Sequence, residues 1–239
     1  KLSHIHLVAN EEAKKRLLQL GEDSSTIHII GSPDLDIMLS PSLPTLAEAK
    51  SRYGIDFDSY FIAIFHPVTT DLEASATAAT EFVNGLIDSG ENFIVIHPNN
   101  DTGFEKILDE YERLTESNTR FRQFKSLRFE HFLVLLKNSR GMIGNSSAGI
   151  REAPLYGIPS IDVGDRQRGR HDSASISQVP ARAHEIVAAL QRAKQEKPAH
   201  SEREFGDGKS TERFTELLHS GVLFEAPVDK VFVDLKDVM

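Results

Sequence analysis

The sequence predicts an α/β protein built around a mainly parallel β-sheet with helices on its faces. From residue 60 onward, short apolar runs alternate with longer stretches of helical periodicity, which is the sequence form of repeated β-α-β units. Turn-forming residues follow each apolar run, so each run is expected to be a separate strand. We expect strands at 60–65, 92–97, 119–124, 141–143 and 158–163, and helices at 72–88, 104–114, 129–137, 148–156, 181–194 and 210–219.

The first 44 residues are organised differently from the rest of the chain. Pro41 and Pro44 lie in a serine-containing stretch, and proline neither donates a backbone hydrogen bond nor continues a helix, so we expect a linker there. We place a domain boundary at this linker. Upstream of it we expect a strand at 4–9, a helix at 11–20 and a second strand at 27–30.

This boundary divides the chain into three expected parts. Residues 45–220 would form a complete domain without internal repeats. The chain opens with Lys1 directly before a strand-like run, which favours a fragment of a longer protein. Residues 1–44 would then be the tail of an amino-terminal domain plus the linker, and residues 221–239 would be a tail that packs on another domain or subunit.

The composition argues against several classes of function. The 239 residues include 27 Lys and Arg against 36 Asp and Glu, for a formal net charge of −9, and they lack the basic cluster that binds a nucleic-acid backbone. No apolar stretch reaches the roughly 20 residues needed to span a bilayer, and no signal-peptide pattern is present. The absence of cysteine excludes disulfides, thiolate catalysis and cysteine-ligated zinc. We expect a cytoplasmic protein without nucleic-acid or membrane partners.

The densest functional signal lies in residues 144–170. Gly144 follows an expected strand and provides a turn, and Asn145, Ser146 and Ser147 are residue types that cap a helix beginning at Ala148. A helix start at the carboxyl end of a parallel strand offers N–H donors and a positive dipole end to phosphate. The alternative is an ordinary capped helix without a ligand.

A carboxylate and a group of arginines favour a nucleotide as that ligand. Glu152 lies roughly one and a half turns into the helix, where its carboxylate can accept both hydroxyls of a ribose. The loop after the next strand contains Arg166, Arg168 and Arg170, and the planar guanidinium group matches phosphate oxygens. Arg168 and Arg170 are also consistent with a solvated loop, so we expect at least one of the three arginines to bind phosphate.

Two further strand ends carry polar side chains. His66 ends the strand at 60–65, and its position at a carboxyl end points it toward the same crevice. Asn99 follows the strand at 92–97 and could hydrogen-bond a base or a sugar. The sequence has no HExxH zinc motif, P-loop, GxGxxG fingerprint or GxSxG elbow. We therefore expect no metal and no cofactor.

Five motifs occur in the order found in one enzyme family. They are HPVTTD (66–71), HPNNDTG (97–103), GNSSAGIREA (144–153), GDRQRGR (164–170) and FGDG (205–208). Together they resemble the hydrolysing UDP-N-acetylglucosamine 2-epimerases, most closely the sialic-acid-pathway branch, over essentially the whole chain. The resemblance implies a GT-B architecture with two Rossmann-like domains, of which the carboxyl-terminal one holds most of the UDP. This chain would be that domain plus the last elements of the amino-terminal one.

The resemblance also implies roles for residues whose motifs match. It assigns Ser146 and Ser147 to the diphosphate, Glu152 to the ribose, Arg166 to phosphate, and Asn99 to the neighbourhood of the nucleoside. These assignments agree with what the residues indicate by themselves for the helix start, the carboxylate and the arginine loop.

Two assignments depend more heavily on the resemblance. It makes His66 the active-site histidine beside the diphosphate. It makes Leu127 a backbone contact of the uracil, although the segment KSLRFE around Leu127 departs from the family pattern.

The implied reaction removes UDP from UDP-N-acetylglucosamine by elimination to a 2-acetamidoglucal, and then adds water to give N-acetylmannosamine. The departing diphosphate needs charge stabilisation, which the helix start and Arg166 could supply. The C2 proton needs a base, and hydration needs a proton donor. Because the family holds these carboxylates in its amino-terminal domain, we expect little or no turnover from this chain alone. We expect a UDP-sugar as its partner and a homo-oligomer in the full-length form.

Three alternatives remain open. The substrate could be UDP-2,4-diacetamido-2,4,6-trideoxyglucose, as in legionaminic-acid pathways. A GT-B glycosyltransferase shares the ribose-binding glutamate and the phosphate-binding helix start, but the combination of HPVTTD and GDRQRGR argues against it. A noncatalytic UDP-sugar-binding module would bind UDP without hydrolysis even after the amino-terminal domain is restored.

Overall fold

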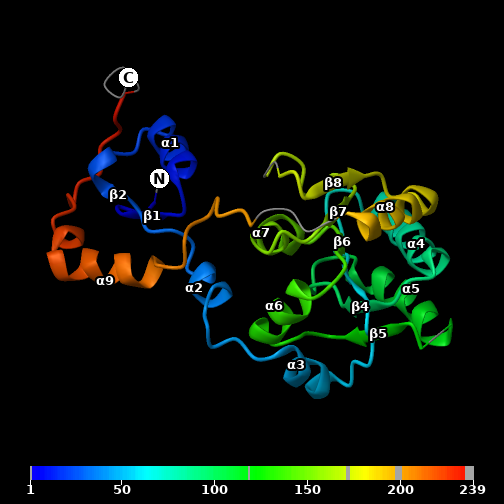
Figure 1. The fold of residues 1–239 in the computed structure, drawn as a ribbon. Helices are drawn as coiled ribbons and strands as arrows, with labels where there is room; N and C mark the ends of the chain where they lie inside the picture. Colours follow the sequence, from blue (N-terminus) through cyan, green and yellow to red (C-terminus); the bar gives the residue numbers. More distant parts are fainter. Residues whose placement is uncertain (1, 118, 171–172, 197–200, 235–239) are drawn as a thin grey trace. The chain divides into compact units, whose positions relative to one another are not determined.

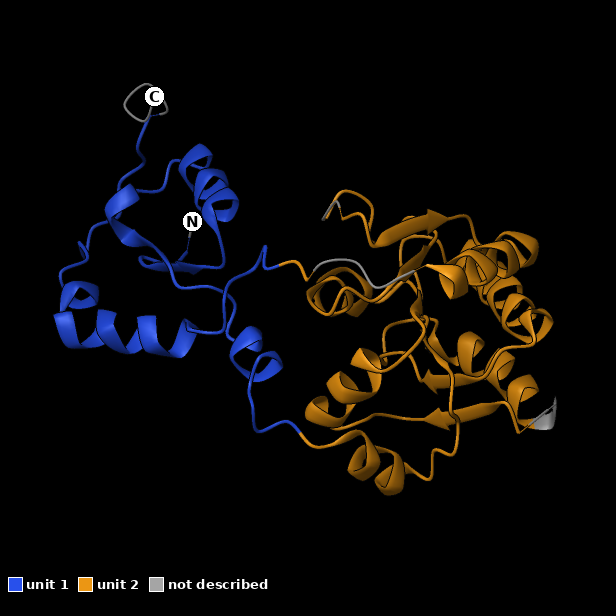
Figure 2. Cartoon of the chain, viewed as in Figure 1, with its two compact units in different colours: residues 1–43, 203–239 blue, residues 44–202 orange. Residues whose placement is uncertain are grey.

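The computed structural model describes residues 2–117, 119–170, 173–196 and 201–234. It forms two compact units, which Figure 2 draws in different colours. Unit 1 comprises residues 1–43 and 203–239, and unit 2 comprises residues 44–202. The expected linker around Pro41 and Pro44 lies where the chain passes from unit 1 to unit 2. The helix expected near residue 210 groups with unit 1, whereas the sequence placed it in the larger domain.

Unit 2 is built on a six-stranded sheet in the order β5-β4-β3-β6-β7-β8, and every neighbouring pair is parallel (Figure 1). From β3, the chain adds β4 and then β5 on one side. It then returns to the other side of β3, where it adds β6, β7 and β8 in turn. The strand order therefore reverses between β3 and β6. The strands are β3 (Phe61–Ile64), β4 (Phe93–Ile96), β5 (Phe121–Phe124), β6 (Met142–Gly144), β7 (Ser160–Val163) and β8 (Ile176–Val179).

Helices cover both faces of this sheet, as a parallel sheet requires. The helices α4 (Leu72–Ser89), α5 (Phe104–Ser117) and α8 (Ala183–Gln195) share one apolar core with alternate residues of the strands. The helices α3 (Leu46–Tyr53), α6 (Phe129–Lys137) and α7 (Ala148–Leu155) cover the other face. Across the described residues, no helix combines the length and the apolar character needed to cross a membrane.

The predicted elements of unit 2 are present, with their ends within three residues of the expected ones. Two elements were not expected. The helix α3 has a capping box, in which Thr45 Oγ1 accepts from Glu48 N at 3.2 Å and Glu48 Oε2 accepts from Thr45 N at 2.8 Å. The sequence contains this T-x-x-E signal directly after the linker prolines. The edge strand β8 carries a weaker signal, because only Val179 of its residues is buried.

Unit 1 contains a two-stranded parallel sheet of β1 (His6–Val8) and β2 (Ile27–Ile29), which confirms the strands expected there. The helix α1 (Glu11–Gln19) is also as expected, and none of its residues is buried. The remaining helices are α2 (Asp34–Met38), which was not expected, and α9 (Ser210–Ser220).

The carboxyl-terminal segment packs within unit 1 as far as the structure describes it. Lys230 Nζ forms an ion pair with Glu22 Oε2 at 2.6 Å, and Val233 N donates to Gly21 O at 3.2 Å. Residues 235–239 of the expected tail lie outside the described residues.

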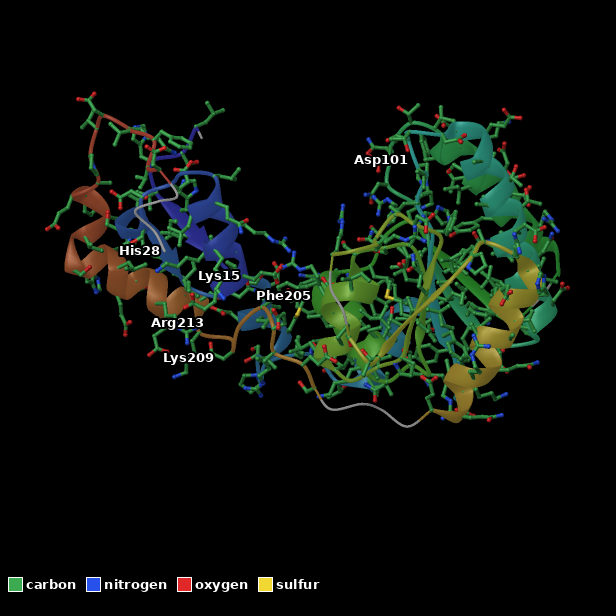
Figure 3. The ribbon with its side chains drawn as sticks, turned by 90° about the horizontal axis from the view of Figure 1, so that it is seen from above. Lys15, His28, Asp101, Phe205, Lys209 and Arg213 are labelled. Atoms are coloured by element: carbon green, nitrogen blue, oxygen red, sulfur yellow. The ribbon has the colours of Figure 1, made fainter. Side chains whose placement is uncertain are left out.

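The carboxylate of Asp36 joins α9 to the amino-terminal elements of unit 1. Asp36 in α2 accepts hydrogen bonds from Ser210 N at 2.9 Å and from Thr211 N at 2.7 Å. These are two of the amides that a helix start leaves without an internal partner. Nearby, Phe205 O accepts from Ser32 N at 2.7 Å, and Figure 3 shows Phe205 close to the start of α9. These bonds explain why α9 belongs with the amino-terminal elements.

We predict that Asp36→Ala destabilises unit 1 by about 0.5–2 kcal/mol, the usual cost of removing a helix cap. Amide hydrogen exchange of the first turn of α9 checks this, because the uncapped amides should lose protection. The matched control is Glu212→Ala, which removes an exposed carboxylate of the same turn. Equal protection in both variants would contradict the capping role of Asp36.

Candidate functional site

The residues expected to bind a ligand gather where the strand order reverses. β3 and β6 are parallel neighbours, with Ile64 opposite Gly144. In doubly wound sheets, ligands bind outside the carboxyl ends of the strands at such a switch point. His66 lies two residues after β3, and Asn145 lies directly after β6. Both residues are therefore at the switch point.

Asn145 ties these two strand ends together. Its side chain accepts from His66 N at 2.7 Å through Oδ1 and donates to His66 O at 2.8 Å through Nδ2. Its backbone N–H donates to Ile64 O at 3.1 Å. The preceding residue must be glycine, because Gly144 has φ 136° and a Cβ there would lie 1.8 Å from Ile64 O. The sequence predicted Asn145 as a candidate helix cap; in the structure its carboxamide holds the backbone of His66 instead.

The imidazole of His66 is held in a neutral form. Its side chain is buried, and Nδ1 accepts a hydrogen bond from Asn99 N at 3.1 Å. With Nδ1 acting as an acceptor, the proton of the neutral ring is assigned to Nε2. Burial, and then the positive charge of Arg166, lower the pKa of His66 to about 4, against a smaller opposite effect of Asp101. His66 is thus a hydrogen-bond donor at neutral pH.

Arg166 is the one arginine of its loop that hydrogen-bonds to the strand-end network described above. Its Nη1 donates to Asn145 O at 3.0 Å, and the side chain is half-buried. Burial, and then the neighbouring charge of Arg170, lower the pKa of Arg166. Arg168 is exposed and paired with Asp165 at 2.6 Å. Arg170 is also exposed. Arg166 therefore differs from Arg168 and Arg170, which remain consistent with a solvated loop.

A cleft of about 640 Å³ lies beside Arg166. It is lined by residues 67–71 after β3, the first turns of α4, Asp101 and residues 164–166. Its volume lies within the range of about 300–1,000 Å³ that is typical of small-molecule sites. Figure 3 labels Asp101 on the loop that precedes α5.

The start of α7 presents two serine side chains. Ser147 is the N-cap residue, but its hydroxyl is exposed and makes no capping bond. Ser146 Oγ accepts from Ala148 N at 3.3 Å. The next amides, of Gly149 and Ile150, bond to the carbonyl groups of Ser146 and Ser147. Because Ser146 Oγ accepts in this bond, its hydroxyl proton is still available. The helix start therefore offers the hydroxyl groups of Ser146 and Ser147 and the positive end of its dipole to an anion.

Glu152 lies on α7, beyond its first turn, and is half-buried. It is close to Tyr156, whose pKa burial and then the charge of Glu152 raise to about 12. The carboxylate is thus on the helix whose start carries Ser146 and Ser147.

Asn99 contacts His66 at the switch point, whereas Leu127 lies at the edge of the sheet. The backbone of Asn99 bonds to His66, while its side chain is exposed. Leu127 is half-buried in the loop between β5 and α6. Because β5 is two strands away from β3, Leu127 lies at the edge of the sheet, away from the switch point.

The sequence interpretation missed two buried polar residues on β7 and its loop. Asp162 is 5% exposed, and its Oδ1 has no hydrogen-bond partner among the described residues. Burial, and then the charge of Asp165, raise the pKa of Asp162 to about 6, while Arg166 acts in the opposite direction. Gln167 is 2% exposed and donates to Asn145 O at 2.8 Å. The available signal for Asp162 was a charged residue between two apolar residues, Ile161 and Val163, of a buried strand.

The arrangement has the chemistry to bind an anion. It combines a neutral imidazole with its proton on Nε2, a guanidinium group, serine hydroxyls and a helix start, and Asn145 hydrogen-bonds to the backbone of His66 and to the side chain of Arg166. Within the described ranges, no group of three His, Cys, Asp or Glu side chains could hold a metal ion.

The chain is similar to curated relatives that are named as 2-epimerases. It is 49% identical over 238 residues to a UDP-N-acetylglucosamine 2-epimerase of Neisseria meningitidis serogroup B, covering 98% of this chain and 63% of the relative. It is 32% identical over 232 residues to a UDP-N,N'-diacetylbacillosamine 2-epimerase (hydrolyzing) of Legionella pneumophila, covering 93% of this chain and 60% of the relative. The chain therefore spans less than two thirds of the length of these relatives.

The chain also resembles a solved structure and matches a family model. The UDP-GlcNAc 2-epimerase of Methanocaldococcus jannaschii, in complex with UDP-GlcNAc and UDP, matches with a TM-score of 0.71 and 20% identity, over 92% of this chain and 62% of that one. This likeness confirms the fold expected of the carboxyl-terminal domain of a GT-B protein. The family model described as UDP-N-acetylglucosamine 2-epimerase matches residues 1–219. The chain belongs to the UDP-N-acetylglucosamine 2-epimerase family.

Proposed function

We propose that this chain is the UDP-binding part of a hydrolysing UDP-N-acetylglucosamine 2-epimerase. The whole enzyme would convert UDP-N-acetylglucosamine and water to N-acetylmannosamine and UDP, in sialic-acid-type sugar biosynthesis. The observation that carries the proposal is the convergence of His66, Arg166 and the start of α7 at the switch point of the sheet. The 49% identity to the Neisseria relative supports the activity.

The anion site fits the diphosphate of UDP. Arg166 would form charge-assisted hydrogen bonds with its oxygens. Ser146 and Ser147 would donate their hydroxyl protons from the start of α7, whose dipole favours negative charge. Glu152, further along the same helix, would accept hydrogen bonds from the ribose hydroxyls. Asn99 would lie near the nucleoside.

The uracil would lie toward the edge of the sheet. In this proposal the backbone of Leu127 contacts the base. A ribose on Glu152 and a base near Leu127 place the nucleoside along the carboxyl ends of the strands, with the diphosphate at the switch point.

His66 would donate a hydrogen bond from Nε2 to the departing diphosphate. Elimination breaks the bond from C1 of the sugar to the diphosphate oxygen and removes the proton from C2. Charge then develops on the diphosphate, where Arg166 and His66 stabilise it. Water subsequently adds across the C1–C2 double bond, with the oxygen bonding to C1 and a proton to C2.

Unit 1 would belong to the amino-terminal domain of the whole enzyme. A parallel sheet of two strands is small for an independent fold, and α1 buries none of its residues. In this proposal further residues cover these surfaces and supply the acid and base for the C2 proton, and this chain alone has little or no turnover.

A second substrate has support from one comparison. The Legionella relative, at 32% identity, is named for a diacetylated bacillosamine sugar and as a hydrolysing enzyme. UDP-2,4-diacetamido-2,4,6-trideoxyglucose is therefore the second candidate. Assaying a polypeptide of the relatives' full length on both UDP-sugars decides between them, because the preferred substrate should have the higher kcat/KM.

We predict that Arg166→Ala and Glu152→Ala each weaken UDP binding by about 1–3 kcal/mol, the scale for hydrogen bonds to charged groups. Calorimetric titration of the chain with UDP, with ADP as the competing nucleotide, measures this. Arg168→Ala is the matched control, because it removes an exposed guanidinium from the same loop. Unchanged affinity in either variant would remove that residue from the site.

We predict that His66→Ala lowers kcat of the full-length enzyme by roughly 100-fold, the effect of removing one donor to developing charge. His66→Gln should retain more activity, because a glutamine amide can donate from near the Nε2 position. Circular dichroism of both variants controls for folding. Normal turnover in His66→Ala would leave His66 with a structural role only.

A further inference from the structure

We propose that Asp162 is a positioning residue whose proton is linked to diphosphate binding: the site binds the diphosphate with Asp162 neutral and takes up a proton when Asp162 starts as a carboxylate. This inference rests on the proposed UDP site. It concerns a residue beneath that site rather than one that touches the ligand.

The position of Asp162 follows from the register of the sheet. Side chains alternate along a strand, and Ile161 and Val163 of β7 belong to the core shared with α4 and α8. Asp162 and Ser160 therefore face the opposite side, where α7 lies. Ser160 Oγ is 2.5 Å from where a Cβ of Gly149 would be, so Ser160 faces the first turn of α7.

Asp162 lies nearer than Ser160 to the end of the strand, below the start of α7. It is paired in register with Gly144, which has no side chain and directly precedes residues 145–147. The carboxyl group thus lies under the segment that joins β6 to α7. This is the segment that carries the serine hydroxyls proposed for the diphosphate.

The buried polar atoms around this segment contain more acceptors than donors. Asp162 Oδ1 and Gln167 Oε1 are buried and have no hydrogen-bond partner among the described residues. Two donors nearby, Arg166 Nη1 and Gln167 Nε2, are both directed at Asn145 O. A buried polar atom without a partner is costly. A proton on Asp162 converts one of the surplus acceptors into a donor.

The charges around Asp162 decide whether diphosphate binding raises or lowers its pKa. On its own loop, Asp162 interacts with Asp165, which opposes its ionisation, and with Arg166, which favours it. β8 contributes no charged residue beside it, and α8 packs on the far face of β7. Arg168 and Arg170 lie further along the same loop. Other charged or titratable groups on neighbouring elements are Arg151, Glu152 and Tyr156 on α7, His66 after β3 and Asp101 after β4.

A bound diphosphate adds negative charge above Asp162. The diphosphate engages Arg166, whose charge favours the carboxylate form of Asp162, and its own negative charge opposes that form directly. The free protein has its Asp162 pKa raised to about 6, and binding raises it further. The contribution of Asp162 to UDP affinity is therefore fully present below about pH 6 and is lost as the pH rises through 6 toward the pKa of the complex.

The test is calorimetric titration of this chain with UDP from pH 5.5 to 8.5, in two buffers of different ionisation enthalpy. Asp162→Asn is the principal variant, since it keeps the shape of the side chain and mimics its neutral form. Between pH 6 and pH 8, the Kd of the native chain should rise roughly 10-fold more than that of Asp162→Asn. UDP itself titrates equally in both experiments, so the difference between the two pH profiles reports on Asp162.

Asp165→Asn is a second variant with its own expectation. It removes the charge that opposes ionisation of Asp162, so proton uptake should persist while the pH at which UDP affinity begins to fall moves downward. Carbon NMR of the Asp162 carboxyl group, with and without UDP, gives an independent readout. Binding with identical pH dependence in the native chain and Asp162→Asn would overturn this inference and leave the UDP site intact. Absence of UDP binding to the native chain at every pH would overturn the UDP site and this inference together.

Discussion

The whole site depends on the carboxamide of Asn145. One side chain satisfies both the N–H and the C=O of His66, which is 79 residues away in the sequence. The backbone carbonyl oxygen of Asn145 accepts hydrogen bonds from Arg166 Nη1 and Gln167 Nε2, which lie in the loop after β7. Three strand ends are thereby connected through one buried residue, so the donors of the site are fixed without the ligand. Such preorganisation is what makes fixed dipoles effective toward a developing charge.

Burial shapes the electrostatics of the site in a consistent way. Desolvation disfavours the charged form of any group, so it lowers the pKa of His66 and raises that of Asp162. A guanidinium group remains charged even when its pKa falls. Arg166 therefore retains its positive charge while the groups beneath and beside it shift toward neutrality. Burial thus affects the titratable groups unequally, and the positive charge that remains on Arg166 supports the anion site that we propose.

The sequence predicted the parallel sheet, its helices and the clustering of polar residues at strand ends, because each depends on local periodicity and on the geometry of β-α-β units. It could not predict what Asn145 binds, since its partner His66 is distant in the chain. α9 was placed in the larger domain because the trans cap from Asp36 leaves no local signal. The short strand β8 was missed because it has only four residues, of which the two central ones are polar and exposed and only Val179 is buried.

The chemistry available to His66 limits what this chain can do. Its Nδ1 already accepts from Asn99 N, and a pKa of about 4 makes the ring a weak base at neutral pH. What remains is donation from Nε2, which helps a diphosphate to depart but does not remove a proton from carbon. In the proposed elimination, leaving-group stabilisation and proton abstraction must therefore be assigned to different groups. In the proposal, the switch point of unit 2 stabilises the leaving group, and a residue other than His66 is the base that removes the C2 proton.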